Sequence, residues 1–392
     1  MNHSYDTVIV GAGPAGSAAA VALARAGRTV LLLDRQAFPR DKPCGDLIGA
    51  RAMTAAYRLG LEASDVTAYP RLAGATITTD SGNLDLAPRS PLGRRLLASS
   101  DARIIPRTVF DDLLVQSAVN SGATLQHATV RDVGAWHEGV RQVRAETSAG
   151  SESIAARSVV IAGGYGCQLA ADIAPQARHD GPPRGIAMRG YFRDVPCPPD
   201  RIVFSLDRWL LPGYGWIFPL PGGRANVGVG ALVSADAADQ KPLRELWRRF
   251  TEETASPADR YLAAATSDGR PRSWPLDLGP RRRRLIADGL IVAGEAAGLV
   301  GPLTGAGIAF ALESGERAGH VLAAAPATGD VSQSRLRHYS AAIRARTAPW
   351  LRGELLAQRF LSDPRRVDRF FAAIRPLPPT GAVGAQLLLH LG

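Results

Sequence analysis

Hydrophobic and polar positions alternate in blocks at the start of the chain. Residues 7–10 (Thr-Val-Ile-Val) form a short apolar run, which is typical of a buried parallel strand. Residues 17–26 are rich in alanine and predict a helix, and Gly27 suits the position that follows a helix end. A second apolar run at 29–33 predicts another strand, which ends at Asp34. These blocks predict a complete βαβ unit.

The turn between the first strand and the helix carries three glycines at a defined spacing. Gly11 permits a tight turn, Gly13 lets the backbone approach a pyrophosphate, and Gly16 lets the helix pack closely on the strand. The start of the helix offers N–H groups to phosphates, and Asp34 stands where an acid accepts hydrogen bonds from a ribose. The unit predicts dinucleotide binding; the alternative is a glycine-rich turn without a ligand.

The later patterns predict a second unit and a helical end. They predict a hairpin over 76–86, a helix over 107–121, a strand over 124–133, a hairpin over 139–162 that returns to the nucleotide sheet, strands over 201–206, 225–233 and 285–293, a helix ending near 325, and two amphipathic helices within 331–375. We therefore expect a discontinuous nucleotide-binding domain (1–75, 100–180 and 285–325), a domain with an antiparallel sheet (76–99 and 181–284) and a C-terminal helical region (326–392).

The charge is strongly basic, but its distribution argues against nucleic acid as a partner. The 392 residues carry a formal net charge of +10, and all but two of the 46 basic residues are arginine, the exceptions being Lys42 and Lys241. The arginines are scattered apart from a run at 281–284, and aromatic residues make up only 6%, whereas a nucleic-acid groove clusters charge and interleaves aromatics. This arginine-for-lysine bias is typical of a GC-rich, actinobacterial-like composition. A basic chain still suits anionic substrates or an anionic membrane surface.

Cysteine, histidine and hydropathy patterns exclude several further classes. Three cysteines (Cys44, Cys167 and Cys197) do not make a disulfide framework, which favours a reducing cytosol. No uninterrupted apolar stretch of about 18 residues and no signal-peptide pattern occurs, so we expect a cytoplasmic protein with at most peripheral membrane contact. The histidines lack metal-ligand spacing and no GxSxG motif occurs, so neither a metal site nor acyl transfer is predicted.

The loop 38–46 holds a candidate reactive thiol. It is rich in proline and charge and contains Cys44, and Arg40 and Lys42 stand close enough in sequence to lower the pKa of that thiol. The alternative interpretation is a buried, inert cysteine beside a glycine turn.

Two glycine-containing segments later in the chain are further candidates. Residues 211–219 are dense in aromatic residues, glycine and proline, so we expect them to be buried against something flat; the alternative is an aromatic plug at a sheet corner. Gly305 and Gly307, at the start of the last helix of the nucleotide unit, suit a second turn that accommodates an anion.

Three motifs carry a resemblance to a known family. They are Lys42-Pro43-Cys44-Gly45-Asp46, Tyr214-x-Trp216-x-Phe218-Pro219 and Pro302-x-x-Gly305-x-Gly307-Ile308. Together they resemble the geranylgeranyl reductase family of FAD-dependent oxidoreductases, which are built like para-hydroxybenzoate hydroxylase, and the resemblance extends over about residues 5–325. It implies an α/β (α+β) fold, with a Rossmann-like FAD-binding domain, an inserted antiparallel-sheet substrate domain and C-terminal helices.

The resemblance also implies the roles of individual residues. It assigns FAD to a set comprising Gly11, Gly13, Pro14, Ala15, Gly16, Asp34, Arg35, Cys44, Gly45, Arg107, Gly294, Glu295, Pro302, Gly305, Ala306, Gly307 and Ile308. It places Tyr214 and Trp216 in the wall of an apolar tunnel for a polyprenyl chain, which would bind through buried apolar area. Hydride chemistry then belongs to the cofactor, and Cys44, Tyr214 or a bound water supplies the proton. The implied catalytic residues are therefore Cys44, Tyr214 and Trp216.

Two segments depart from the family's pattern. Gly294-Glu295 stands where the family usually has Gly-Asp, which keeps the charge and adds one methylene. Residues 163–167 (Gly-Gly-Tyr-Gly-Cys) replace a motif with Ala-Asp-Gly that is associated with flavin and NAD(P)H contacts. The electron donor is therefore open between NAD(P)H and another source, such as a reductase partner.

Three functions remain as hypotheses at this point. The leading one is reduction of C=C bonds in a polyprenyl or similar hydrophobic substrate. The second is a flavin-dependent oxidase, monooxygenase, halogenase or oxidative cyclase that tailors a bacterial secondary metabolite. The third is a non-catalytic prenyl-binding escort protein. An apolar tail at 386–389 suits docking on the body, on a second subunit or on lipid.

Overall fold

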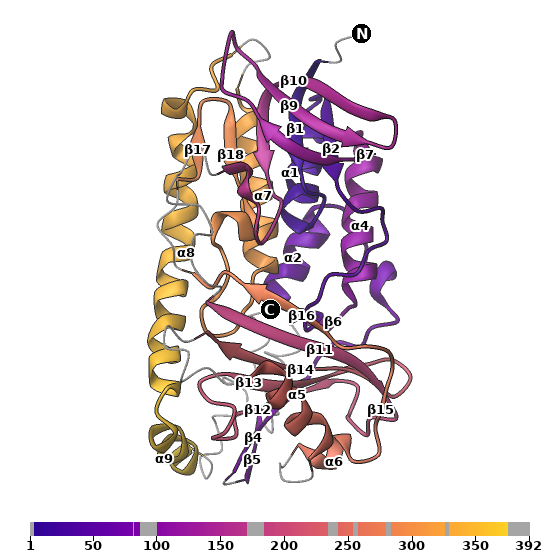
Figure 1. The fold of residues 1–392 in the computed structure, drawn as a ribbon, viewed down its shortest axis with the longest axis vertical. Coiled ribbons are helices and arrows are strands. Elements are labelled where there is room, and N and C mark those ends of the chain that lie inside the picture. Colours follow the sequence, from indigo (N-terminus) through magenta and orange to yellow (C-terminus); the bar gives the residue numbers. More distant parts are fainter. Residues whose placement is uncertain are drawn as a thin grey trace.

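The structure is a computed structural model that describes residues 4–80, 82–86, 100–170, 184–233, 242–253, 258–279, 284–325 and 329–374. The arginines at 281–283, Lys241 and the apolar tail at 386–389 lie outside these residues. Two large sheets make up most of the molecule, one in the upper and one in the lower half of Figure 1.

The first sheet joins strands from distant parts of the chain. Its parallel strands follow the spatial order β18 (Leu290–Val292), β10 (Gly150–Ile161), β1 (Ser4–Val10), β2 (Val30–Asp34) and β7 (Thr124–His127), with β17 (Ile286–Ala287) as an antiparallel edge. Every residue of β2 is buried. This is the expected property of an apolar strand that is covered on both faces of a parallel sheet.

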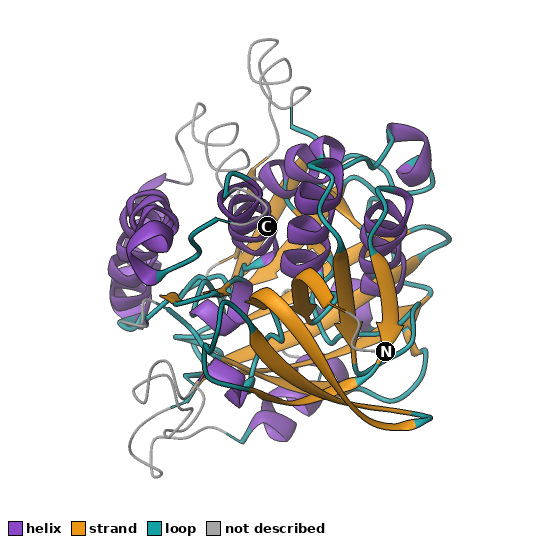
Figure 2. Ribbon diagram, turned by 90° about the horizontal axis from the view of Figure 1, so that it is seen from above, coloured by secondary structure: helices purple, strands orange, loops and turns teal. Residues whose placement is uncertain are grey.

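Helices cover one side of this sheet, and a long antiparallel hairpin lies on the other (Figure 2). The helices are α1 (Pro14–Arg25), α2 (Ala50–Arg58), α4 (Arg107–Asn120) and α7 (Ile308–Ala323), and β8 (Thr129–Val133) and β9 (Arg141–Thr147) extend the long strand β10. Helices α1 and α7 meet closely, because a Cβ atom at Gly315 would lie 2.0 Å from the carbonyl oxygen of Ala15. The N-terminal βαβ unit is therefore completed by a helix from residues beyond 300.

The second sheet is antiparallel apart from one strand pair. Its order is β15 (Thr266–Ser267), β11 (Gly185–Arg193), β14 (Arg224–Leu232), β13 (Tyr214–Leu220), β12 (Arg201–Ser205), β4 (Gly74–Thr79) and β5 (Gly82–Leu86), with β16 (Arg272–Leu276) also paired to β11 and β12 parallel to β4. Helices α5 (Leu243–Glu252) and α6 (Asp259–Leu262) pack on one face through Phe250 and Tyr261. The opposite face carries the side chains that line the large cavity described below.

Smaller elements connect the two sheets. They are the two-stranded sheet of β3 (Leu47–Ile48) and β6 (Arg103–Ile104), and the short 3₁₀ helices η1 (Ala63–Val66), η2 (Gln168–Ala170) and η5 (Gly294–Ala297). The long helix α8 (Gln333–Leu361) runs along the molecule beside both sheets and leads into α9 (Pro364–Ile374) (Figure 1). Within the described residues, no helix is long and apolar enough to cross a bilayer.

The fold class is the one predicted, and the elements predicted over 17–26, 124–133 and 285–293 differ in detail from those observed. Residues 124–133 form two strands, β7 and β8, which belong to different parts of the first sheet, and 285–293 form the hairpin β17–β18. Residues 214–220 form the strand β13, which pairs on both edges and is largely buried, as expected for this segment, and they are not the alternative plug at a sheet corner. The helix predicted over 17–26 begins at Pro14, because proline without its N–H is tolerated in the first turn. The division into three domains stays a prediction.

Candidate functional site

One cavity of about 740 Å³ lies between the two sheets and receives residues from both. Its lining includes most of the predicted site residues, which are Gly11, Gly13, Pro14, Ala15, Asp34, Arg35, Cys44, Gly45, Arg107, Tyr214, Trp216, Glu295, Gly305, Ala306, Gly307 and Ile308. Gly16, Gly294 and Pro302 do not line it and instead support the segments that do. Residues predicted from three separate motifs thus surround a single space.

The glycines of the first turn bring backbone atoms together. A Cβ at Gly16 would lie 1.8 Å from the oxygen of Gly11, and Gly11 itself has a φ of +98° with Ala162 directly opposite. Helix α1 begins at Gly13 without a side-chain cap or an acidic residue in its first turn. Its first N–H groups therefore face the cavity as a positively polarised end.

Asp34 has a structural contact in addition to its place in the cavity lining. One of its carboxylate oxygens accepts the N–H of Ala12 at 2.8 Å, and the other accepts the N–H of Gln36 at 2.9 Å. Each carboxylate oxygen has a second acceptor site. Asp34 can therefore hold the glycine turn and still has a free acceptor site for a hydroxyl; that it binds a ribose stays a prediction.

Arg107, which was predicted to contact the cofactor, forms a buried ion pair with Asp111. Arg107 is 4% exposed and makes two bonds to Asp111, at 2.6 and 2.7 Å, and Arg40 approaches the same carboxylate at 3.0 Å. Burial lowers the pKa of Arg107, but the attraction of Asp111 and of Cys44 outweighs it and raises that pKa above its ordinary value. Arg107 is therefore charged at every accessible pH. Asp111 could not be selected from the sequence, because it is one of two adjacent acids in an ordinary helix.

The second glycine turn is supported from behind by helix α8. Glu354 is 6% exposed and accepts the backbone N–H groups of Leu303 and Thr304, each at 3.1 Å. Gln358, one helical turn later, donates to the carbonyl of Pro302. Helix α7 then starts at Gly307, again without a side-chain cap. Glu354 is thus a site-supporting residue that the sequence analysis missed.

Glu295, the longer acid in the second flavin-type motif, pairs with Lys42. Its carboxylate lies 2.8 Å from the Lys42 ammonium, which also lies 5.8 Å from the centre of the Trp274 ring. The other carboxylate oxygen of Glu295 is buried and has no hydrogen-bond partner among the described residues. Glu295 therefore keeps one free acceptor in a wall of the cavity.

The loop with Cys44 is fixed by a polar cluster at the second sheet. The Asn226 amide donates to the carbonyl of Cys44 at 2.8 Å and to the carboxylate of Asp46 at 2.7 Å. Trp216 donates its indole N–H to the Asn226 oxygen at 2.9 Å, and Tyr191 donates its hydroxyl to Asp46 at 2.8 Å. A single amide thereby fixes both the Cys44 loop and the Trp216 ring.

Asp46 is an unusual group at the centre of this cluster. It is fully buried, and its φ of +62° is uncommon for a residue other than glycine. Burial raises the pKa of its carboxyl to about 6, although the hydrogen bonds from Asn226 and Tyr191 act in the opposite direction. Cys44 accepts the N–H of Asp46 through its sulfur at 3.4 Å.

The face of the second sheet that lines the cavity changes from charged to apolar along one row. Paired residues cross the sheet in the order Arg272, Arg189, Gly228, Trp216, Phe204 and Ile77. Arg189 and Arg272 both pair with Asp41 at the charged end. At the other end, Phe204 packs edge-to-face on Tyr214 and Phe218, with ring centres 5.6 and 5.3 Å apart. The cavity therefore has one polar and one aromatic end.

Tyr214 and Trp216 lie in this aromatic wall as predicted, but their hydrogens already have acceptors. The Tyr214 hydroxyl donates to the carbonyl of Thr304, and burial raises its pKa well above the ordinary value. The Trp216 N–H is bonded to Asn226. The third candidate catalytic residue, Cys44, forms no disulfide, and its sulfur accepts the N–H of Asp46.

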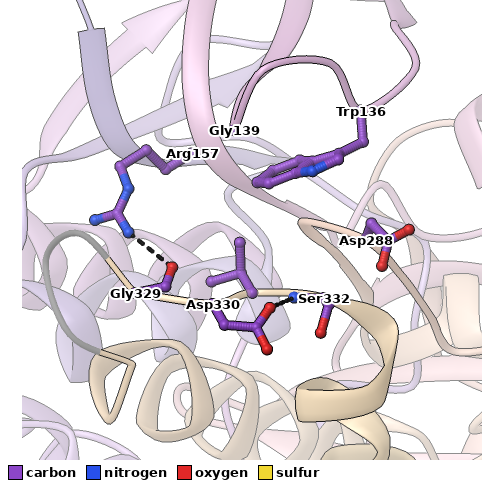
Figure 3. A pocket seen from close by; sticks show the side chains of 8 residues that line it. Trp136, Gly139, Arg157, Asp288, Gly329, Asp330 and Ser332 are labelled. Atoms are coloured by element: carbon purple, nitrogen blue, oxygen red, sulfur yellow. Dashed lines mark hydrogen bonds between the residues drawn. The ribbon is translucent and has the colours of Figure 1, made fainter.

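A smaller hollow of about 380 Å³ lies away from these residues, against the first sheet (Figure 3). Arg157 closes one side by donating to the carbonyl of Gly329 at 3.1 Å, and Asp330 accepts the N–H of Ser332 at 2.7 Å. The Trp136 ring forms the other side and leaves no room for a Cβ at Gly289. It contains none of the predicted site residues, and we assign it no chemistry.

The large cavity fits a dinucleotide with an attached planar ring. The two helix starts without side-chain caps, at Gly13 and Gly307, suit phosphate and ring oxygens. The buried Glu295 oxygen can accept a hydrogen bond from a ligand. No group of histidine, cysteine and acidic side chains within the described residues suits a metal ion. The fold and the cavity together define a flavin-dependent oxidoreductase.

Comparison with known proteins gives the family. A family described as "FAD binding domain" matches residues 4–352, and the chain belongs to it. A menaquinone reductase of Mycobacterium tuberculosis is 33% identical over 333 residues, which cover 82% of this chain and 77% of that protein. Digeranylgeranylglycerophospholipid reductase 2 of Methanopyrus kandleri is 32% identical over 344 residues, with 86% and 81% covered. The protein is an FAD-dependent oxidoreductase of the geranylgeranyl reductase type.

Solved structures share the same fold at lower identity. A geranylgeranyl bacteriochlorophyll reductase-like protein from Thermoplasma acidophilum has a TM-score of 0.84 at 22% identity, with 99% of this chain and 96% of that chain covered. A myxobacterial chondrochloren halogenase has a TM-score of 0.75 at 21% identity, with 99% and 97% covered. The fold is therefore common to reductases and halogenases and does not choose between them.

Proposed function

We propose that this enzyme reduces C=C bonds in the polyprenyl chain of a hydrophobic substrate. The observation that carries the proposal is the row of paired residues that leads from the polar end of the cavity to Trp216, Phe204 and Ile77. A polyprenyl chain has only apolar surface to offer, and burial of that surface is worth about 25 cal/mol per Å² before ordering costs. The names of the relatives, a menaquinone reductase and a digeranylgeranylglycerophospholipid reductase, agree with a substrate of this class.

The residues of the chain have separable tasks in such a reaction. The glycine turns at Gly11 and Gly305, with Asp34 and Glu295, would hold FAD, and FAD that an electron donor has reduced would supply the hydride. The aromatic wall holds one double bond in place and excludes water from the reacting carbons. The Cys44 thiol lines the cavity and gives its proton to the carbon that does not receive the hydride. The buried Arg107 guanidinium stabilises the thiolate that remains until solvent returns a proton.

Replacement of the thiol tests this assignment. Cys44→Ala is expected to lower turnover about 10²–10⁴-fold, the usual contribution of a general acid, while flavin content and melting temperature stay close to the parent values. Cys197→Ala is the matched control, because Cys197 is also half-buried but lies outside the cavity. Parallel losses of activity and melting temperature in Cys44→Ala would show that the thiol is only structural.

The electron donor is tested by the visible spectrum of the purified protein under anaerobic conditions. Bleaching of the flavin band by NADPH or NADH would make the enzyme self-sufficient, despite the altered segment at 163–167. A band that persists with both nucleotides would indicate a separate reductase as partner, or oxidative chemistry driven by the substrate. Purification without any flavin would favour a prenyl-binding escort protein.

A second candidate function is halogenation or another oxidative reaction on a small metabolite. The observation in its favour is that Lys42, a residue type on which flavin-dependent halogenases depend, lines the cavity. Its ammonium is, however, paired with Glu295. Chloride incorporation that disappears in Lys42→Met, with no reduced polyprenyl product from the parent enzyme, would select this function over the first.

A further inference from the structure

The end of helix α8 and helix α9 carry an unusual concentration of exposed apolar side chains. Leu356, Phe360 and Phe370 are 65%, 38% and 47% exposed. Among the described residues only two other large apolar side chains are exposed, Val119 and Leu125, and they belong to the first sheet and its helix α4. The Phe360 and Phe370 rings stack edge-to-face with centres 5.6 Å apart, so the two helices present one surface. We call Leu356, Phe360 and Phe370 the α8–α9 patch.

Arginines surround the α8–α9 patch. Within residues 352–369 of these two helices, five arginines are exposed, namely Arg352, Arg359, Arg365, Arg366 and Arg369. The nearby acids are largely neutralised, because Asp363 pairs with Arg366 at 3.0 Å and Asp368 pairs with Arg208 from the turn between β12 and β13. Glu354 points inward and holds the turn at Thr304. The patch therefore combines apolar side chains with an excess of positive charge.

The inner side of the same helix pair closes the apolar end of the cavity. Leu361, which follows Phe360 directly, lines the cavity. Val367 and Phe371 of α9 are buried in one cluster with Trp216 and Phe218 of the aromatic wall. The helix pair that carries the α8–α9 patch on its exposed side therefore contacts the aromatic end of the cavity through its buried side.

These features select one kind of partner. A stable protein interface takes about 20–30 residues a side, and three side chains inside an arginine rim are too few. The rim would also repel its own copy in a symmetric pair. Helices with leucine and phenylalanine on one side and arginine beside them are typical of segments that lie in a bilayer interface, and the arginines favour anionic headgroups.

We propose that the α8–α9 patch docks the enzyme on an anionic bilayer surface, with the apolar end of the cavity next to the lipid. Phe360, Phe370 and Leu356 enter the headgroup region, and the arginines contact lipid phosphates. The proposal that a polyprenyl lipid then passes from the bilayer to the aromatic wall rests on the proposed function; the docking itself does not.

Vesicle co-sedimentation of the full flavin-loaded chain tests the docking. The parent protein should bind vesicles of phosphatidylglycerol mixed with phosphatidylcholine and bind phosphatidylcholine alone at least tenfold more weakly. Leu356→Ser/Phe360→Ser/Phe370→Ser should lose about tenfold or more of the binding to the anionic vesicles. Val119→Ser/Leu125→Ser is the matched control, because it removes the other exposed apolar pair, and it should bind as the parent does.

A charge variant makes the test independent of any folding defect in the apolar one. Arg352→Gln/Arg359→Gln/Arg365→Gln keeps the apolar side chains and should weaken binding to anionic vesicles, with a loss of salt sensitivity. Binding that is unchanged in both triple variants would overturn the proposal. So would an absence of vesicle binding together with a parent dimer that the apolar variant converts to a monomer.

The two proposals fail separately. With a short polyprenyl substrate dissolved in detergent, the apolar triple variant should turn over at the parent rate, because none of its three positions lines the cavity. If the parent protein binds anionic vesicles but reduces no polyprenyl substrate, the docking stands and the proposed reaction is wrong.

Discussion

The two walls of the cavity are built by opposite means. On the side of the first sheet, the wall depends on close backbone packing: a Cβ atom would meet a neighbour at less than 3 Å at Gly11, which lines the cavity, and at Gly16 and Gly294, which support it. On the side of the second sheet, the wall is made of side chains, in which Trp216 and Asn226 are set by strand register and by hydrogen bonds. One wall therefore depends on the absence of side chains, and the other on their identity.

This difference separates stability from selectivity. A backbone wall tolerates no added atoms, so most changes there should affect folding and cofactor binding together. A wall of side chains can change shape while the strands stay paired. We expect it to carry the differences between substrates within this family.

The strongest test of the backbone wall is Gly16→Ala. Its Cβ would lie 1.8 Å from the Gly11 oxygen, and neither backbone segment can move without separating α1 from β1. We expect a loss of about 4 kcal/mol or more of unfolding free energy and little retained flavin, measured by denaturant unfolding and by absorbance. In Gly353→Ala nothing lies within 4 Å of the new Cβ, so this helix position should become more stable by about 0.5–1 kcal/mol. Equal unfolding free energies and flavin contents in the two variants would show that the backbone wall is not constrained in this way.

The Asp46 carboxylate accepts hydrogen bonds from both sides of the cavity, from the Arg107 N–H on one side and from Tyr191 and Asn226 on the other. Its replacement tests how much this link contributes to stability. The pKa of Asp46 is raised from 3.8 to about 6, so its contribution to stability is complete below pH 3.8 and is lost as the pH rises through 6. The loss amounts to about 3 kcal/mol at 1.36 kcal/mol per pKa unit. Asp46→Asn cannot ionise, so its melting temperature relative to the parent should rise between about pH 4 and pH 7. Parallel melting curves over that range would show that Asp46 ionises normally.

The side-chain wall is tested by two glycines on the same face of one strand. A Cβ at Gly228 would lie 2.0 Å from the Trp216 ring, whereas at Gly230 the nearest atom of that ring is 3.8 Å away. Gly228→Ala should displace Trp216 and lower turnover about a hundredfold, as misplacement of a substrate by about 1 Å does. Gly230→Ala should stay within a few-fold of the parent, and both should retain flavin. Loss of flavin from Gly228→Ala would mean that the two walls are not separable.

The sequence predicted the backbone wall well, because its chemistry is local. Gly11, Gly13, Gly16 and Asp34 lie within one βαβ unit, and their spacing reports a turn that only glycine permits. The motifs at Cys44 and Gly305 were placed at the same site by resemblance, and both line the cavity. Fold class and cofactor followed from these segments.

The residues that support the site from other elements could not be predicted. Asn226 is a single polar residue in the apolar strand β14, and its partners Cys44 and Asp46 lie 180 or more residues earlier. Glu354 and Asp111 look like ordinary helix acids until α8 and α4 are placed. The role of Asn226, Glu354 and Asp111 becomes visible only from their hydrogen-bond partners. Those contacts depend on sheet order and helix packing, which no local sequence pattern encodes.

The close contact of α1 with α7 has a consequence for the synthesis of the protein. Gly315 and Gly319 of α7 fit against Ala15 and the Ala19–Ala22 turn of α1 with no room for another atom, yet about three hundred residues separate the two helices in the chain. During translation, α1 has no helix to pack against until α7, which ends at Ala323, has left the ribosome. The two ends of the cofactor cradle therefore come together only when most of the chain exists, and a nascent chain cut short before that point has no complete place for the flavin.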